Sequence, residues 1–205
     1  AFTGERGTSL VFGGPAMELI PERMPATMEL AFLAMVIAVA IGVPLGMFAG
    51  LKPDSNVSKT IMAGSIVGFS LPTFWVGLML ILVFAVAFGW LPAFGRGGPE
   101  HLILPAIALG WYPVAAQMRI VRSGMLDVME SDYIRLSRAL GTPERLLIWK
   151  YAFRNAAVPL LTMLGVYFAA MLGGAFIVEV IFAWPGIGRM VDISYGFVDP
   201  RIRND

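Results

Sequence analysis

Residues 26–50 read ATMELAFLAMVIAVAIGVPLGMFAG, and no charged side chain follows Glu29 in this stretch. A helix needs about 20 mostly apolar residues to cross roughly 30 Å of hydrocarbon. Residues 61–90, 101–118 and 156–183 meet the same requirement. None of the four segments alternates polar and apolar residues as a transmembrane β-strand does. The sequence therefore predicts an all-α, polytopic transmembrane helical bundle with four visible spans, which we treat as a single domain over residues 1–205.

The composition supports this prediction. The 205 residues are 58% hydrophobic and 14% charged, whereas a soluble domain is about half apolar and about a quarter charged. A soluble chain of this size would have to cover its surface with polar groups, and contact with lipid removes that requirement. The formal net charge is +1 without a dense basic stripe, so nucleic acid is not expected as a partner.

Lysine and arginine predict the orientation, because cytoplasmic loops collect basic residues. Nine of them lie in the connections 51–60 and 119–154, and four lie in the segments expected on the opposite side. We therefore place residues 51–60 and 119–154 in the cytoplasm. The stretch before the first span then lies outside, and we expect a further span upstream of Ala1.

Glycine spacing suggests how the spans pack. Gly42, Gly46 and Gly50 lie four residues apart in the first span, as do Gly64 and Gly68 in the second. Small residues at this spacing let two helix backbones approach closely. We interpret them as helix-packing positions rather than as part of a substrate path.

Groups for chemistry are scarce in this sequence. Cysteine is absent and His101 is the single histidine, which argues against a metal site or a nucleophilic enzyme. None of the three lysines follows a glycine, so the chain contains no P-loop. The expected spans hold few charges, and Glu29 and Glu179 fall near the outer boundary, where interfacial placement or a hydrogen bond inside the bundle would explain them. We therefore expect the energy for any transport to come from a partner subunit.

The longest polar stretch, residues 119–154, is expected to contain a short surface helix. Asp132 is placed to cap this helix, and Tyr133, Leu136 and Leu140 follow at helical spacing on one apolar face. A rigid helix of this kind could transmit force to a partner, or it could rest on lipid headgroups. Composition favours neither alternative.

A turn and a second helix follow in the sequence. Gly141 is expected to end the short helix, Thr142 to be the N-cap of the next one, and Pro143 to occupy its first position. The second helix is expected to run through residues 145–155 and back into the membrane at Pro159. The predicted arrangement is helix, glycine turn, helix.

Residues 130–141 (ESDYIRLSRALG) and 154–159 (RNAAVP) resemble the cytoplasmic "EAA" loop of binding-protein-dependent ABC importer permeases, and in particular the dipeptide/oligopeptide/nickel branch of DppB/OppB type. Further stretches agree in the same order, namely 23–31 (RMPATMELA), 71–75 (LPTFW), 89–92 (GWLP), 101–105 (HLILP) and 179–188 (EVIFAWPGIG). The pattern is degenerate, since Arg-Leu-Ser stands at 135–137 where Glu-Ala-Ala would be, and the following proline comes later.

The resemblance implies a type I ABC importer permease-like bundle in the inner or plasma membrane of a prokaryote. It implies a second homologous permease, ATP-binding cassette subunits that bind ATP and Mg, an external solute-binding protein, and no cofactor or metal in this chain. Residues around 130–145 would form the coupling helix that sits in a groove of the ATPase. The implied coupling and turn positions are Glu130, Asp132, Tyr133, Arg135, Arg138, Ala139, Leu140, Gly141 and Glu144.

Members of this branch usually have six spans, so the first and last family spans are expected to be missing here. We hypothesise that the sequence joins segments around an omitted stretch near residues 190–192.

The leading functional hypothesis is a permease subunit of a di-/oligopeptide importer. A nickel or other small-solute importer is the alternative within transport, an ion-coupled carrier or channel is an alternative from another class, and a membrane-embedded enzyme is the weakest. The sequence assigns no substrate-binding residues.

Overall fold

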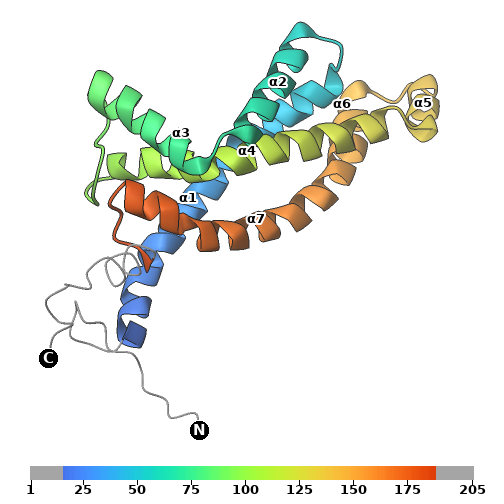
Figure 1. Ribbon diagram of the computed structural model, residues 1–205. Helices are drawn as coiled ribbons and strands as arrows, with labels where there is room; N and C mark the ends of the chain where they lie inside the picture. Colours follow the sequence, from blue (N-terminus) through green and yellow to red (C-terminus); the bar gives the residue numbers. More distant parts are fainter. Residues whose placement is uncertain (1–15, 188–205) are drawn as a thin grey trace, which may run out of the picture.

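The computed structural model describes residues 16–187, and every regular element in that range is helical. The elements are α1 (Ala16–Leu51), α2 (Asn56–Ser70), α3 (Thr73–Leu80), the π-helical turn η1 (Ile81–Ala87), α4 (Glu100–Met129), α5 (Asp132–Ala139), α6 (Glu144–Leu146), the π-helical turn η2 (Leu147–Phe153) and α7 (Arg154–Ile181) (Figure 1). The prediction of an all-α fold is confirmed.

Two helical stretches are long and apolar enough to cross a membrane, Arg23–Leu51 and Glu144–Ile181. The expected span 61–90 is a bent pair instead of one straight helix, because α2 and α3–η1 meet at 106°. The bend lies at Leu71 and Pro72, which both have extended backbone angles. Proline lacks an N–H and disfavours a helical conformation for the residue before it, which explains the break. If the bent pair counts as one span, the described chain has three candidates.

Helix α4 lies at the centre of the bundle and contacts α1, α2, α3 and α7 (Figure 1). The expected span 101–118 falls within it, but α4 is not among the helices selected by length and hydropathy. Polar residues such as Gln117 lower its apolar character, and Gln117 is fully buried. Polar side chains inside a membrane bundle face neighbouring helices or cavities rather than lipid. The span 101–118 therefore stays a prediction.

Close packing of α1 on α4 depends on the predicted glycines. A Cβ atom on Gly42 would lie 2.9 Å from the carbonyl oxygen of Val114, and one on Gly46 would lie 2.7 Å from that of Met118. These distances are too short for any side chain, so the two backbones approach as predicted for this spacing. Gly64 has no atom of the described chain within 4 Å of its Cβ position and lines an open groove, so its packing role stays a prediction.

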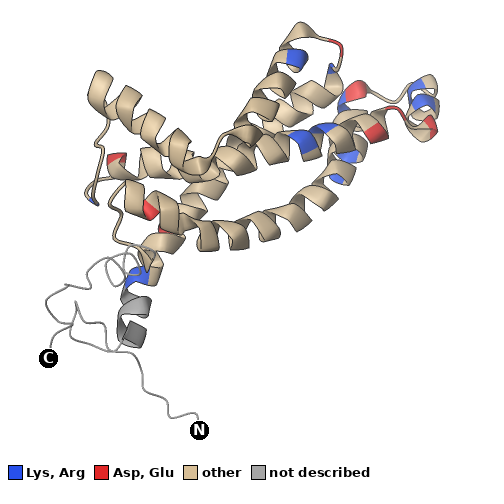
Figure 2. Cartoon of the chain, in the orientation of Figure 1, with Lys and Arg blue, Asp and Glu red and all other residues tan. Residues whose placement is uncertain are grey.

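Charged residues gather at the two ends of the described bundle, around α5 and around the start of α1, while most of the length between them is uncharged (Figure 2). Within α4, the basic residues are Arg119 and Arg122, both in its second half. This distribution agrees with a bundle that presents an apolar surface to lipid and charged ends to water.

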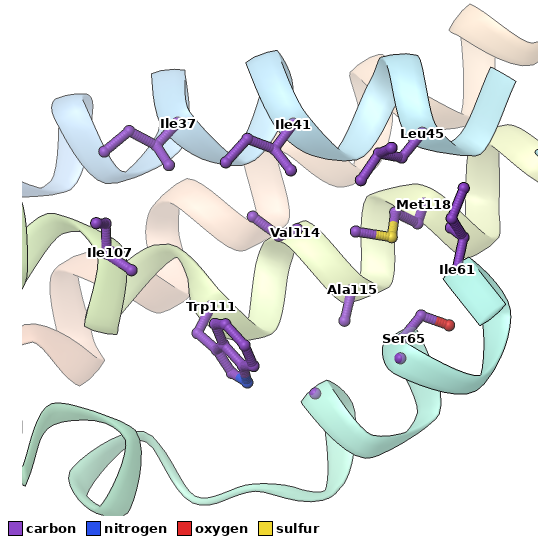
Figure 3. Close-up of a pocket in the computed structure, with 12 residues that line it drawn as sticks. Ile37, Ile41, Leu45, Ile61, Ser65, Ile107, Trp111, Val114, Ala115 and Met118 are labelled. Atoms are coloured by element: carbon purple, nitrogen blue, oxygen red, sulfur yellow. The ribbon is translucent and has the colours of Figure 1, made fainter. Parts of the chain in front are cut away.

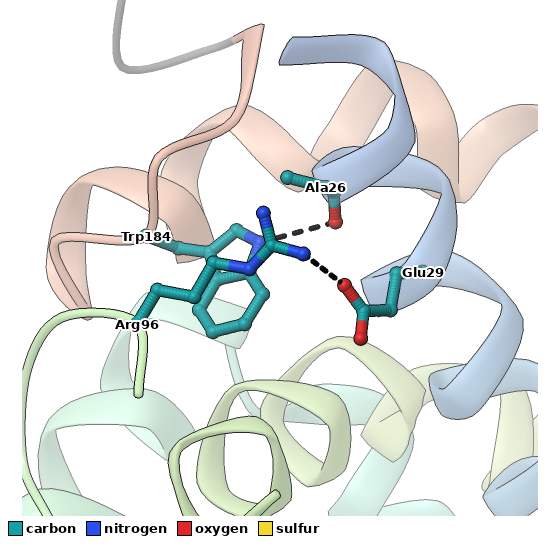
Figure 4. A network of polar contacts seen from close by, with 4 residues as sticks. All are labelled: Ala26, Glu29, Arg96 and Trp184. Atoms are coloured by element: carbon teal, nitrogen blue, oxygen red, sulfur yellow. Dashed lines mark hydrogen bonds and ion pairs between the residues drawn. The ribbon is translucent and has the colours of Figure 1, made fainter. Parts of the chain in front are cut away.

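The end of the bundle opposite α5 is closed by contacts between distant segments. The indole N–H of Trp184 donates to the carbonyl oxygen of Ala26 at 3.1 Å, and Arg96 pairs with Glu29 at 2.7 Å (Figure 4). The Arg96 guanidinium also lies 5.5 Å from the centre of the Trp184 ring. These contacts join α1, the loop before α4 and the segment after α7.

Thr27 and Glu179 form a second contact at this end. The hydroxyl of Thr27 donates to the Glu179 carboxylate at 2.5 Å, and both side chains are buried. The expected hydrogen bond inside the bundle is therefore confirmed for Glu179. Glu29 instead forms its ion pair at a partly exposed position.

Candidate functional site

The short helix predicted in the 119–154 stretch is α5, and it begins one residue later than its predicted cap. Ser131 is the N-cap residue with an extended backbone, and Asp132 is the first helical residue. The prediction that Asp132 caps the helix is therefore wrong. Its carboxylate lies in the first turn, where negative charge is favourable, and it is 3.6 Å from the guanidinium of Arg135.

One buried residue anchors α5 to the rest of the chain. Ile134 is 0% exposed, and α5 packs against α4 and η2. The predicted apolar face points the other way, since Tyr133, Leu136 and Leu140 are 46%, 61% and 78% exposed. Helix α5 therefore has two apolar sides, one seated on its own bundle and one largely exposed, where the ring centres of Tyr133 and Tyr151 lie 6.5 Å apart.

The glycine turn after α5 forms as predicted. Gly141 has a φ of 81°, in the left-handed region that glycine adopts without a steric penalty. Its N–H donates to the carbonyl oxygen of Arg138 at 3.0 Å, and the N–H of Thr142 donates to that of Ser137 at 3.1 Å. These two bonds are the Schellman pattern that ends a helix at a left-handed residue.

The next helix also starts one residue later than expected. Pro143 is its N-cap residue and Glu144 is its first helical residue, so the predicted roles of Thr142 and Pro143 are shifted by one position. From Glu144 the chain continues through α6, η2 and α7 to Ile181 as one helical stretch of 38 residues. Pro159 lies inside α7 and does not end it.

An ion pair bridges the turn. Arg138 donates from Nε to Oε1 of Glu144 at 2.6 Å and from Nη2 to Oε2 at 3.4 Å. This hydrogen bond lowers the pKa of Glu144 below its ordinary value. A bidentate guanidinium–carboxylate pair fixes both distance and orientation, so it fixes how α5 sits relative to α6.

The predicted coupling residues share one property, which is exposure. Each of the nine has an exposed side chain or, for glycine, an exposed backbone: Glu130, Asp132, Tyr133, Arg135, Arg138, Ala139, Leu140, Gly141 and Glu144. Figure 1 shows that α5 forms one extremity of the described chain, beyond the ends of α4 and α7. The sequence did not single out Leu136 as a coupling position, although it belongs to the same exposed face.

Two hollows lie on different sides of α4. One is an apolar groove among α1, α2 and α4, lined by residues such as Ile41, Leu45, Val114 and Met118 (Figure 3). The other is a cavity of about 480 Å³ among α2, α4 and α7, which is lined by Met62, Phe69, Ala116, Arg119, Ile120, Arg122, Ser123 and Tyr167. Sequence reasoning missed this second cavity, because it counted Arg119 and Arg122 only as topological charges.

Comparison with known proteins identifies the family. The model of the binding-protein-dependent transport system inner membrane component family matches residues 42–204. This chain belongs to that family. The permease resemblance seen in the sequence is thereby confirmed, and the chain is a non-catalytic, multi-pass subunit of an ABC importer in the inner membrane. ATP is bound by a partner ATPase in such a system, and the family description implies a binding protein as a further partner.

Several permeases are similar over nearly the whole chain. The dipeptide transport system permease protein DppB of Alkalihalophilus pseudofirmus is 37% identical over 98% of this chain and 78% of its own length. The oligopeptide transport system permease protein AppB of Bacillus subtilis is 38% identical over 98% of this chain and 66% of its own length. The glutathione transport system permease protein GsiC of Salmonella choleraesuis is 37% identical over 92% of this chain and 61% of its own length.

Solved structures agree on the fold. The inward-facing MetNI methionine ABC transporter matches with a TM-score of 0.71 at 19% identity, over 90% of this chain and 83% of the other. An amino acid ABC transporter crystallised with histidines matches with a TM-score of 0.63 at 25% identity, over 91% of this chain and 84% of the other.

One relative contains sequence without a counterpart in this chain. The alignment with the dipeptide permease runs over 259 positions, which exceeds the 205 residues here, so that relative contains segments this chain lacks. The join hypothesised near residues 190–192 lies outside the described residues.

Proposed function

We propose that this chain is the permease subunit of an ATP-driven importer of di- and oligopeptides, and that it forms half of the translocation pathway with a second homologous permease. The dipeptide and oligopeptide permeases among its relatives support the substrate class. The similarity to a glutathione permease makes short, peptide-like anions a second candidate class. The single observation that carries the coupling role is the exposed apolar face of α5, the surface formed by Tyr133, Leu136 and Leu140.

This surface is suited to an ATPase for a mechanical reason. Ile134 holds one side of α5 on the bundle, and the Arg138–Glu144 pair fixes α5 to the start of the following helix. That helix then continues for 38 residues, which at 1.5 Å per residue corresponds to about 57 Å. A displacement of α5 by ATP binding would therefore reach the far side of the membrane through one continuous element.

A surface helix resting on lipid headgroups is the competing explanation for α5. Such a helix would bury its apolar face in the interface. The Leu136→Gln/Leu140→Gln double variant separates the two explanations, with Leu136→Met/Leu140→Met as the matched apolar control. The permease is expressed with its partner permease and ATPase subunits, and ATPase co-purification and ATP-dependent peptide uptake are measured.

The glutamine variant is expected to reach the membrane in normal amounts but to lose the ATPase, while the methionine variant retains it. Normal co-purification and uptake with the glutamine variant would exclude the coupling role of this surface. Retained ATPase binding with no uptake of any di- or oligopeptide by the wild-type assembly would instead exclude the proposed substrate class.

A further inference from the structure

We infer that the cavity among α2, α4 and α7 binds the carboxylate of the solute in transit, and that Arg119 and Arg122 are the residues that hold it. This inference rests on the proposed function, since it assigns the part of that pathway that recognises a free acid group. Arg119 is exposed at the cavity and Arg122 is partly buried.

The charges of the cavity are uncompensated in the described chain. Neither Arg119 nor Arg122 forms an ion pair with a carboxylate among residues 23–187. The Nε atom of Arg122 is buried there without a hydrogen-bond acceptor. A buried charged donor without a partner is costly, so an acceptor that arrives from outside the described chain would be favoured.

The geometry suits a planar anion. Arg119 and Arg122 are three residues apart in α4, which places both side chains on one face of the helix. The Arg119 guanidinium lies 5.5 Å from the centre of the Phe69 ring, which restricts its position. The rigid fork of donors on each guanidinium matches the two oxygens of a carboxylate. Ser123 and Tyr167 contribute hydroxyl groups to the same lining.

A smaller hollow shares Tyr167 with the cavity, on the seam between α4 and α7. It has a volume of about 140 Å³ and is lined by residues that include Thr73, Tyr112 and Tyr167. The Tyr112 ring lies 4.5 Å from Phe69 and 6.1 Å from Tyr167. A series of aromatic rings and hydroxyls leading to two arginines is suited to a peptide, which carries apolar side chains and one terminal carboxylate.

A lipid phosphate offers similar chemistry, because it is also an oxyanion that pairs with guanidinium groups. Arg119 begins the stretch 119–154 that the basic residues place in the cytoplasm, so a headgroup would also meet the two arginines where α4 leaves the membrane. A headgroup would not need the hollow around Tyr112. The other side of α4 does not compete for an anion, since the groove drawn in Figure 3 is almost entirely apolar. The cavity with the two arginines is therefore better suited to the solute than to lipid.

The test uses the complete importer, reconstituted in proteoliposomes with its binding protein. Uptake of a dipeptide and of the same dipeptide with an amidated C-terminus is measured at saturating binding protein, for wild type, Arg119→Gln, Arg122→Gln and Arg122→Lys. The control is Lys59→Gln, which removes an exposed basic residue at the start of α2, outside the cavity. ATPase activity and subunit assembly are measured for every variant.

Each Arg→Gln variant is expected to reduce uptake of the free acid about tenfold relative to the amide, as loss of a charge-assisted hydrogen bond predicts. Arg122→Lys is expected to recover part of the preference for the free acid over the amide. Lys59→Gln is expected to leave that preference unchanged. An unchanged acid-to-amide ratio in both glutamine variants would overturn the inference while peptide transport itself stands. Failure of the wild type to import peptides would count against the proposed function instead.

Vesicles of phosphatidylcholine with and without phosphatidylglycerol separate the lipid explanation. If the arginines bind an anionic lipid headgroup, the glutamine variants lose the response to phosphatidylglycerol and keep their preference for the free acid over the amide, which overturns the inference. If they bind the solute, the acid preference falls equally in both kinds of vesicle. If Arg122→Gln fails to assemble, Arg119→Gln and Arg122→Lys still decide the outcome. Arg119→Gln removes one charge at an exposed position, and Arg122→Lys keeps the positive charge at position 122.

Discussion

Arg138 and Glu144 face each other across the turn at Gly141, with 2.6 Å between Nε and Oε1. One residue belongs to α5 and the other begins α6, so their pairing joins the exposed helix to the long helix behind it. Both side chains are accessible to water. The value of the pair lies in fixing an angle between two elements rather than in stabilising the fold.

The Arg138–Glu144 pair should resist moderate acid. Hydrogen bonding to Arg138 lowers the pKa of Glu144, so the contribution of the pair is complete above the ordinary Glu pKa of about 4.3 and is lost as pH falls through the lower, folded-state value. A nitroxide attached at position 139 in an Ala139→Cys variant reports the mobility of α5. We expect constant mobility from neutral pH down to the ordinary Glu range and a rise below it.

Glu144→Gln removes the charge and should make α5 more mobile at neutral pH, with little further change in acid. Asp127→Asn is the matched control, because Asp127 is an exposed acid in the last turns of α4 outside this turn. Equal mobility in wild type and Glu144→Gln at neutral pH would show that the pair does not position α5.

Gly141 should be hard to replace, for a reason of backbone conformation. Its φ of 81° costs a residue with a Cβ roughly 1–2 kcal/mol. No atom lies within 4 Å of its Cβ position, so a substitution is not excluded by space. Gly141→Val should therefore reduce ATPase co-purification, whereas Gly141→Asn should retain more, because asparagine tolerates the left-handed region better.

The comparison between Val and Asn at Gly141 separates conformation from contact. If the ATPase rejects any side chain at this position, both variants fail equally, and the conformational explanation is wrong. Co-purification from detergent extracts, normalised to the amount of permease, gives the ranking.

Gly46 and Gly64 each belong to a pattern of glycines four residues apart, but alanine at the two positions should have opposite effects on stability. A Cβ on Gly46 would lie 2.7 Å from the carbonyl oxygen of Met118, so Gly46→Ala must separate α1 from α4. Gly64 has free space, and alanine there restricts the unfolded chain, which is worth about 0.4–1 kcal/mol at a compatible site. We expect a lower melting temperature of the assembled permease for Gly46→Ala and an equal or higher one for Gly64→Ala. An equal fall in melting temperature for both alanine variants would indicate that another helix fills the groove beside Gly64.

The fold could be predicted to the level of helices, and the reasons are local. A charge-free run such as residues 26–50 has few alternatives to a membrane helix, and Gly141 between two helical patterns permits little except a turn. The two predicted N-caps, Asp132 and Thr142, were each wrong by one residue. Ser131 and Pro143 adopt the extended backbone angles of an N-cap, and the neighbouring residues could equally have taken them. Pro72 explains why the chain bends at Leu71, but the angle of 106° depends on packing against α4.

The candidate site could likewise be predicted from the sequence only in part. Exposure of Leu136 and Leu140 could not be read from periodicity, because apolar helical faces in membrane proteins point to lipid, to the protein's own bundle or to a partner. The structure decides between faces only because Ile134 is buried on the bundle. The cavity at Arg119 needs Phe69 and Tyr167 from two other helices, and no local pattern brings those three residues together.

The last prediction concerns the contact between Thr27 and Glu179 at the opposite end of the bundle. The backbone N–H of Ile187 donates to the Thr27 hydroxyl at 3.1 Å, while that hydroxyl donates to the carboxylate of Glu179. A Cβ on Gly186 would overlap this carboxylate. The threonine therefore joins the start of α1 to the segment after α7, and glycine at 186 leaves room for the acid.

Thr27→Val keeps the shape of the side chain and removes both hydrogen bonds, which should cost about 1–3 kcal/mol because charged and backbone groups are left without this partner. Gly186→Ala should destabilise the same end, whereas Gly173→Ala should be neutral, since Gly173 has no atom within 4 Å of its Cβ position. Thr27→Ser retains the hydroxyl and should recover most of the loss. Melting temperatures of the assembled importer give the ranking, and a Thr27→Val variant as stable as wild type would show that the contact does not hold this end closed.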